Sequence, residues 1–165
     1  MKIREFTESD WDQTWPILRD VIRAGDTFTY EPGMSEREAH DIWVERPPGL
    51  TVVATRNDRV QGTAKMGPNR AGPGAHVATA SFMVAADARG LGVGTKLCAF
   101  ALDWARTQGF AGMQFNAVAE SNTTATAIYQ RLGFEIVGTV PGAFAHPQKG
   151  RTGLYVMYRA LESRS

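Results

Sequence analysis

The stretch Arg89-Gly90-Leu91-Gly92-Val93-Gly94-Thr95 joins an apolar run, residues 80–85, to a helix-like segment, residues 96–107. Its three alternating glycines leave a row of main-chain N–H groups that no side chain covers. Because these groups precede a helix, they point outward with the positive end of the helix dipole behind them. The stretch therefore predicts a binding site for a phosphate or pyrophosphate, and with it a phosphorylated cofactor.

Length and composition favour one folded domain, residues 1–165. The chain is long enough to bury a core, and 43% of its residues are hydrophobic. Its formal net charge is +1, from 18 basic and 17 acidic residues without a Lys/Arg block, so we expect no nucleic-acid partner. The sequence shows neither a signal peptide nor an apolar run that could span a bilayer, so we expect a cytoplasmic protein without a membrane partner.

The periodicity of apolar residues predicts four helices and seven strands. Capping boxes at Ser9/Asp12 and Ser35/Glu38 are expected at the first two helices, and residues 141–153 are expected to form a long loop. Three strands in a row do not suit a doubly wound sheet, which alternates strand and helix. We therefore expect a mixed α/β (α+β) fold with a central mixed sheet of about six to seven strands and helices on both faces. The strands are expected over residues 2–6, 51–55, 60–66, 76–85, 113–119, 135–140 and 154–160.

Three kinds of phosphate loop compete for the glycines. The dinucleotide pattern Gly-x-Gly-x-x-Gly fails because its sixth position is Thr95, and the nucleotide-triphosphate pattern fails because Thr95-Lys96 has the reverse order. The third pattern is Arg/Gln-x-x-Gly-x-Gly/Ala between a strand and a long helix, and Arg89, Gly92 and Gly94 match it. A glycine-rich turn that only lets the helix pack closely on the strand stays open as the structural alternative.

With this loop the sequence resembles the GNAT superfamily of acyl-CoA-dependent N-acyltransferases. A second motif of that family follows after one strand: Asn122-x-x-Ala125-x-x-Ile128-Tyr129-x-x-Leu132-Gly133-Phe134. The resemblance covers most of residues 50–160. It implies acetyl-CoA as co-substrate and, by analogy, a homodimer.

The resemblance also implies where the coenzyme binds. Residues 89–95 would hold its pyrophosphate, and the main chain of the preceding strand would pair with the pantetheine arm as an added strand does. The implied cofactor-binding residues are Phe82, Met83, Val84, Arg89, Gly90, Leu91, Gly92, Val93, Gly94, Thr95, Asn122, Ala125 and Tyr129. Asn122 is equally suited to cap its helix, and both roles are compatible.

Tyr129 is the residue that the resemblance places at the leaving thiolate, as its proton donor. Acid catalysis of this type contributes about 10²–10⁴-fold in rate. The alternative is a core aromatic on the apolar face of its helix. An α-amine with a pKa of about 7.7–8.0 is roughly one-tenth neutral at pH 7 and barely needs a base. The candidates for a catalytic base are Glu31 and Glu120, whereas Cys98 is expected to be a small apolar residue inside a helix.

The segment from Thr27 to Pro32 resembles the acceptor loop of phosphinothricin acetyltransferases. The resemblance implies that Thr27, Phe28, Tyr30 and Glu31 bind the acceptor. Around Asn116 the sequence resembles yeast acetyltransferases that act on proline analogues, where Asn116 would donate to a substrate carboxylate. A hydrogen bond from Asn116 to a neighbouring loop is the structural alternative.

We therefore expect direct acetyl transfer, without a cysteine-linked intermediate, to a small-molecule amine, an amino acid or an analogue. Three histidines without ligand-like spacing predict no metal site. The alternative functions are a protein or peptide N-acetyltransferase and a non-catalytic acyl-CoA sensor.

Overall fold

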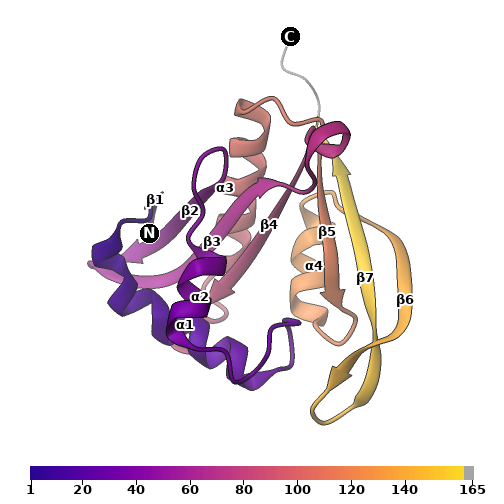
Figure 1. Cartoon of the computed structure of the whole chain (residues 1–165), viewed down its shortest axis with the longest axis horizontal. Coiled ribbons are helices and arrows are strands. Elements are labelled where there is room, and N and C mark those ends of the chain that lie inside the picture. Colours follow the sequence, from indigo (N-terminus) through magenta and orange to yellow (C-terminus); the bar gives the residue numbers. More distant parts are fainter. Residues whose placement is uncertain (162–165) are drawn as a thin grey trace.

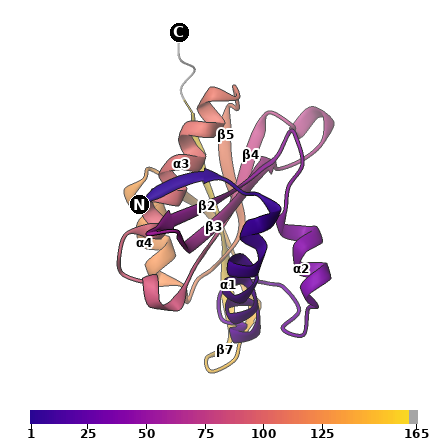
Figure 2. The same ribbon diagram turned by 90° about the vertical axis from the view of Figure 1, so that its left-hand side faces the viewer.

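The computed structural model describes residues 1–161 and shows a seven-stranded sheet between two layers of helices (Figures 1 and 2). The strands lie in the order β1-β2-β3-β4-β5-β7-β6, and each neighbouring pair is antiparallel except β4 and β5. The expected mixed sheet with helices on both faces is confirmed. The elements are β1 (Lys2–Glu5), α1 (Trp11–Ala24), α2 (Glu36–Trp43), β2 (Leu50–Arg56), β3 (Arg59–Pro68), β4 (Val77–Val84), α3 (Val93–Thr107), β5 (Gly112–Ala119), α4 (Thr123–Arg131), β6 (Glu135–His146) and β7 (Gly150–Ala160).

The two faces of the sheet bury separate apolar cores. Residues of α1 and α2, such as Leu18 and Trp43, pack with Met83 of β4 on one face. Residues of α3 and β5, such as Leu97 and Phe115, pack on the other. Because side chains alternate along a strand, β4 contributes to both cores and is central to the molecule.

The start of the first helix differs from its expected capping pair. The Thr7 N–H donates to Asp10 Oδ2 at 2.8 Å, so the pair lies two residues earlier than Ser9 and Asp12. Asp10 is also held by a salt bridge from Arg4, at 2.7 Å. The prediction was wrong because the partner of the Asp10 carboxylate, Arg4 in the preceding strand, lies outside the three-residue spacing of a capping box.

Other local predictions are confirmed. Ser35 and Glu38 form a capping box, with the Glu38 N–H donating to Ser35 Oγ and the Ser35 N–H to Glu38 Oε2. Asn57 and Asp58 join β2 to β3 with φ values of 50° and 60°, the left-handed conformation that a two-residue hairpin turn requires.

The prediction of a long loop over residues 141–153 was wrong, because most of these residues continue two strands. β6 runs to His146 and β7 begins at Gly150, so the hairpin turns over only three residues. The strand register shifts between Val140 and Phe144, which accommodates Pro141 and Gly142 as an irregularity within β6. These residues are turn signals in sequence, but here they bend a strand instead of ending it.

None of the helices within residues 1–161 is both long and apolar enough to cross a membrane.

Candidate functional site

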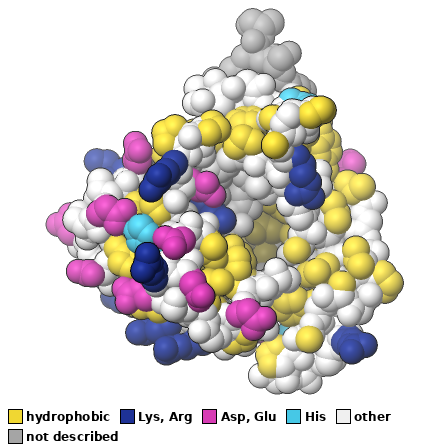
Figure 3. Space-filling view, in the orientation of Figure 1, with side chains coloured by type: hydrophobic (Ala, Val, Ile, Leu, Met, Phe, Trp, Pro, Cys, Tyr) yellow, Lys and Arg dark blue, Asp and Glu magenta, His cyan; other side chains and the backbone are white. Residues whose placement is uncertain are grey.

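The central feature of the site is a seam between β4 and β5. These two strands pair at only two positions, Val77 with Gly112 and Ala78 with Met113, and then diverge. The divergence opens a cavity of about 890 Å³. Figure 3 shows it as a hollow in the face of the molecule, with hydrophobic side chains at its floor. Beyond Ala78, one edge of β4 therefore faces the cavity instead of a neighbouring strand.

The glycine stretch forms one end of this cavity. Gly90 and Gly92 have φ values of 78° and 79°, and Gly92 is the N-cap of α3. The Lys96 N–H donates to the Gly92 carbonyl at 3.1 Å, so the three preceding N–H groups of the helix have no partner one turn earlier. A Cβ atom placed on Gly90 or Gly92 would meet nothing within 4 Å. The turn therefore does not depend on close packing at these two glycines, and the space at their Cβ positions is open.

Most of the residues that the sequence assigns to the coenzyme line the cavity. They are Phe82, Met83, Val84, Arg89, Gly90, Gly92, Val93, Gly94, Thr95, Asn122, Ala125 and Tyr129. Leu91 is the exception, because it lies outside the lining and its side chain is 54% exposed.

Tyr129 lies in an aromatic cluster on the α4 side of the cavity. Its ring centroid is 4.5 Å from that of Phe115, and the rings of Phe82 and Phe134 lie 6.1 and 6.0 Å away. No hydrogen bond within residues 1–161 engages its hydroxyl. Burial, and secondarily the nearby Cys98, raises the pKa of Tyr129 well above its ordinary value. Its phenol is thus a protonated group in the cavity wall, in contact with other aromatic rings.

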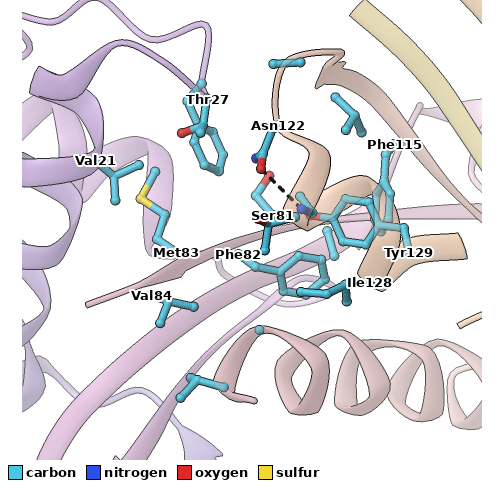
Figure 4. Close-up of a pocket in the computed structure, with 18 of the residues that line it drawn as sticks. Val21, Thr27, Ser81, Phe82, Met83, Val84, Phe115, Asn122, Ile128 and Tyr129 are labelled. Atoms are coloured by element: carbon cyan, nitrogen blue, oxygen red, sulfur yellow. Dashed lines mark hydrogen bonds between the residues drawn. The ribbon is translucent and has the colours of Figure 1, made fainter. Parts of the chain in front are cut away.

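Asn122 caps the helix that carries Tyr129. Its Oδ1 accepts the Ala125 N–H at 3.2 Å, which confirms the predicted cap. In Figure 4, Asn122 and Tyr129 lie on one side of the cavity, and Val21, Thr27 and Met83 on the other.

The connection between α1 and α2 forms that other side. Thr27, Phe28 and Tyr30 line the cavity, and their role in acceptor binding stays a prediction. The rings of Phe28 and Tyr30 stack with centroids 5.7 Å apart and an interplanar angle of 6°. Burial, and secondarily the charge of Glu45, raises the pKa of Tyr30. These two rings give this side of the cavity a flat apolar wall.

Neither candidate base reaches the cavity wall. Glu31 and Glu120 are both exposed and are not among the lining residues. Glu120 Oε2 accepts the Gly153 N–H at 2.8 Å, so this carboxylate ties the end of β5 to β7. The position of these two carboxylates therefore does not support a role for either residue as the catalytic base.

Asn116 lines the cavity and makes hydrogen bonds to its surroundings. Its Nδ2 donates to Asn69 Oδ1 at 2.7 Å, and its Oδ1 accepts from Gln114 Nε2 at 2.9 Å. Asn116 therefore makes the hydrogen bond to a neighbouring loop that the structural alternative predicts. Its amide nevertheless lies at the cavity surface.

Several lining residues lack a motif in the sequence. Asp26, Thr79, Ser81 and Arg131 bring polar groups to the cavity, and Val21 brings an apolar one. The alternation of side chains along β4 could have indicated Thr79 and Ser81, since both lie on the same face of the strand as Met83. Asp26 and Arg131 lie at the ends of helices, where a charged residue carries no such signal.

Cys98 is fully buried inside α3, and burial raises its pKa to about 12. Its thiol is protonated at neutral pH, in agreement with a packing role. Within residues 1–161, no group of His, Cys, Asp and Glu is arranged to hold a metal ion.

Comparisons with known proteins agree with this geometry. The structure of a GCN5-related N-acetyltransferase from Kribbella flavida is 48% identical, with a TM-score of 0.95 over 97% of each chain. A ribosomal-protein-alanine N-acetyltransferase from Brucella melitensis is 26% identical, with a TM-score of 0.86 over 98% of this chain and 100% of that one. A phosphinothricin acetyltransferase from Sinorhizobium meliloti, solved with AcCoA, shares the fold at 21% identity, with a TM-score of 0.87 over 97% of this chain and 88% of that one.

One curated relative matches a shorter stretch. Protein SPT10 of Saccharomyces cerevisiae is 33% identical over 76 residues, which are 46% of this chain and 12% of the yeast protein. The family model described as the acetyltransferase (GNAT) family matches residues 11–134. The glycine turn before α3, the seam in the sheet and these matches agree: the chain belongs to the acetyltransferase (GNAT) family.

Proposed function

We propose that this protein transfers the acetyl group of acetyl-CoA to the amine of a small molecule, an amino acid or amino-acid analogue, by direct attack in a ternary complex. One observation carries the proposal. A single cavity is lined both by the start of α3 and by the connection between α1 and α2, with Tyr129 also in its wall. A phosphorylated donor and an amine acceptor can therefore occupy one continuous space.

The donor end fits a nucleotide thioester. The N–H groups at residues 89–95, including that of Leu91, would bind the pyrophosphate, and Arg89 would add a charge-assisted contact. The free edge of β4 at residues 82–84 offers main-chain donors and acceptors to an amide-containing arm. Asn122 and Ala125 line the opposite wall. Acetyl-CoA supplies an activated acetyl group on sulfur.

The reaction joins the amine nitrogen to the thioester carbon and breaks the bond from that carbon to sulfur. An acceptor that starts as an ammonium first loses one proton to water. The two candidate bases, Glu31 and Glu120, lie outside the lining and are not placed to take it. The sulfur leaves with the bonding electron pair. We propose that the Tyr129 hydroxyl donates its hydrogen to this sulfur, since burial disfavours the phenolate. The nitrogen loses its second hydrogen as the amide forms, and the Tyr129 phenolate takes up that proton, so the residue ends the reaction protonated. The products are an N-acetylated amine, the coenzyme thiol and one proton.

The experiment measures acetyl-CoA consumption with a panel of amino acids and small amines. We expect Tyr129→Phe to lower kcat by about 10²–10⁴-fold while the affinity for coenzyme A is kept. Tyr158→Phe is the matched control, because Tyr158 is not among the lining residues. An unchanged kcat in Tyr129→Phe would remove this residue from the mechanism, and wild-type inactivity on every amine would refute small-molecule transfer.

A second candidate is N-acetylation of a protein or peptide. It is favoured by the likeness to the ribosomal-protein-alanine N-acetyltransferase. Mass spectrometry of a cell lysate incubated with isotope-labelled acetyl-CoA separates the two: labelled proteins or peptides support this candidate, and labelled small amines support the first. Coenzyme binding without any labelled product would indicate the sensor instead. The homodimer and the cytoplasmic location stay predictions.

A further inference from the structure

We infer that Asp26 selects the acceptor by charge: its carboxylate binds the ammonium group of an amine whose own net charge is positive. This inference rests on the proposed function and specifies the acceptor end of the same cavity. Asp26 has no part in the sequence motifs.

The first observation is where α1 ends. Gly25 has a φ of 63° and forms the left-handed C-cap of α1, so the chain turns there and residues 26–30 line the cavity. Asp26 is the first residue after the turn and is half-buried. Among residues 1–161 its carboxylate has no hydrogen-bond or salt-bridge partner. A carboxylate without a partner is stabilised by a cation that enters beside it.

The second observation is the distribution of charge over the cavity. Of the lining residues that the structure describes, Asp26 is the only acidic one, and Arg89 and Arg131 are the basic ones. Arg89 belongs to the glycine stretch before α3, at the donor end, and Arg131 is the last residue of α4. Coenzyme phosphates are attracted by these arginines and repelled by a carboxylate. The charge of Asp26 therefore serves the acceptor and not the donor.

The third observation concerns the cation that could neutralise the acceptor side. Lys65 of β3 lies opposite Ser81 in the strand pairing, but it does not line the cavity. Its Nζ donates to the Ile42 carbonyl at 2.7 Å and lies 3.7 Å from Glu45 Oε1. Lys65 is thus already neutralised by its own partners, and the acceptor side keeps the negative charge of Asp26.

The surroundings of Asp26 indicate the rest of the acceptor. The stacked rings of Phe28 and Tyr30 offer an apolar wall, and Val21 and Met83 add to it. The lining residues beside Asp26 that could bind an acceptor carboxylate are neutral, such as Thr27, and β5 adds the neutral amide of Asn116. A carboxylate therefore gains neutral hydrogen bonds but is repelled by Asp26. The acceptor that fits best is a primary amine with an apolar body and a neutral amide or ester in place of a free carboxylate.

The test compares matched pairs of probes, L-phenylalaninamide with L-phenylalanine and L-leucinamide with L-leucine. In the wild type we expect each amide to have a kcat/KM at least about 10-fold above that of its amino acid. Asp26→Asn is expected to raise KM for the amides by about 10-fold or more and to remove the preference. The KM for acetyl-CoA stays within about 3-fold, and Asp26→Glu restores part of the affinity.

The control is Asp20→Asn, which removes a carboxylate from the outer surface of α1. Its side chain is 64% exposed and lies outside the cavity lining, so all constants are expected to stay at wild-type values. An equal KM for the amides in wild type and Asp26→Asn would overturn the inference while leaving acetyl transfer intact.

A binding measurement separates failure of the inference from failure of the proposed function. Calorimetry of L-phenylalaninamide and of 3-phenylpropionate with the coenzyme-A-loaded protein needs no turnover. We expect the cation to bind the wild type at least about 10-fold more tightly than Asp26→Asn, and the anion to bind Asp26→Asn better than the wild type. If transfer fails on every amine but this pattern holds, only the proposed function falls. If the cation does not bind, or binds both proteins equally, the inference falls.

Discussion

Replacing Gly92 by alanine separates the ligand-binding role of the α3 turn from its conformational role. Gly92 has a φ of 79°, where an L-residue costs about 1–2 kcal/mol. A Cβ there meets no protein atom within 4 Å, so no steric term adds to this cost. For a chain of this size, 1 kcal/mol corresponds to about 2–4 °C in Tm, and we expect a decrease of about 2–8 °C.

The new methyl group would lie beside the main-chain N–H groups of residues 89–95. If it displaces a phosphate oxygen from one charge-assisted hydrogen bond, the loss is about 1.5–3 kcal/mol. This corresponds to an increase in Kd for coenzyme A of roughly 10- to 150-fold. Calorimetric titration with coenzyme A measures the affinity, and a thermal melt of the same sample measures Tm.

Gly109 provides the matched control at the opposite end of the same helix. It has a φ of 84°, its Cβ position is also empty within 4 Å, and it lies outside the cavity lining. Gly109→Ala is expected to lower Tm by about as much as Gly92→Ala and to leave Kd unchanged. If Gly92→Ala binds coenzyme A as tightly as Gly109→Ala, phosphate binding at the start of α3 is refuted.

Three further predictions concern single side chains. Cys98→Ala is expected to keep full acetyl transfer, and wild-type Cys98 to resist alkylation by iodoacetamide at pH 8 in mass spectrometry, because burial raises its pKa to about 12. The Arg4 guanidinium, followed by the Thr7 N–H and hydroxyl, lowers the pKa of Asp10 against an opposing effect of burial, so the carboxylate stabilises the fold above its unfolded pKa of about 3.9. Asp10→Asn should cost about 1–2 kcal/mol in urea unfolding at pH 7, a value that allows for the partly exposed Arg4, and the difference should shrink as the pH falls below about 4. Asn122→Ala removes the cap of α4 and should cost about 0.5–2 kcal/mol by the same assay.

Local patterns carried most of what the sequence predicts correctly. The turn at residues 89–95 and the cap at Asn122 depend on neighbours in the chain, so spacing and residue type suffice. Pro141 and Gly142 led to a wrong prediction because both residues are typical of loops, and both are also tolerated in an irregular edge strand such as β6.

The acceptor side of the site could not be predicted in the same way. Asp26 becomes part of the cavity wall because of the turn at Gly25, and no periodic pattern marks it. Glu31 and Glu120 are carboxylates in loops near the motifs, yet the fold directs them elsewhere. Glu120 shows why, since its partner is a main-chain N–H 33 residues further along. Proximity in sequence therefore says little about which of several acids enters a cavity.

The seam between β4 and β5 has a consequence for solubility at high concentration. β4 carries no charged side chain from Val77 to Val84, and an open edge of such composition ordinarily recruits strands of other molecules and promotes aggregation. Here the unpaired edge lies inside the molecule, flanked by β5 on one side and by the helices on both faces of the sheet. A slender ligand fits a gap of this kind, whereas the strand of a second folded protein would have to pass β5 and the helices on both faces. The fold therefore keeps unpaired main-chain groups of β4 available for binding. It does so without the lysines and prolines that protect exposed edge strands in other sheets from pairing with further chains.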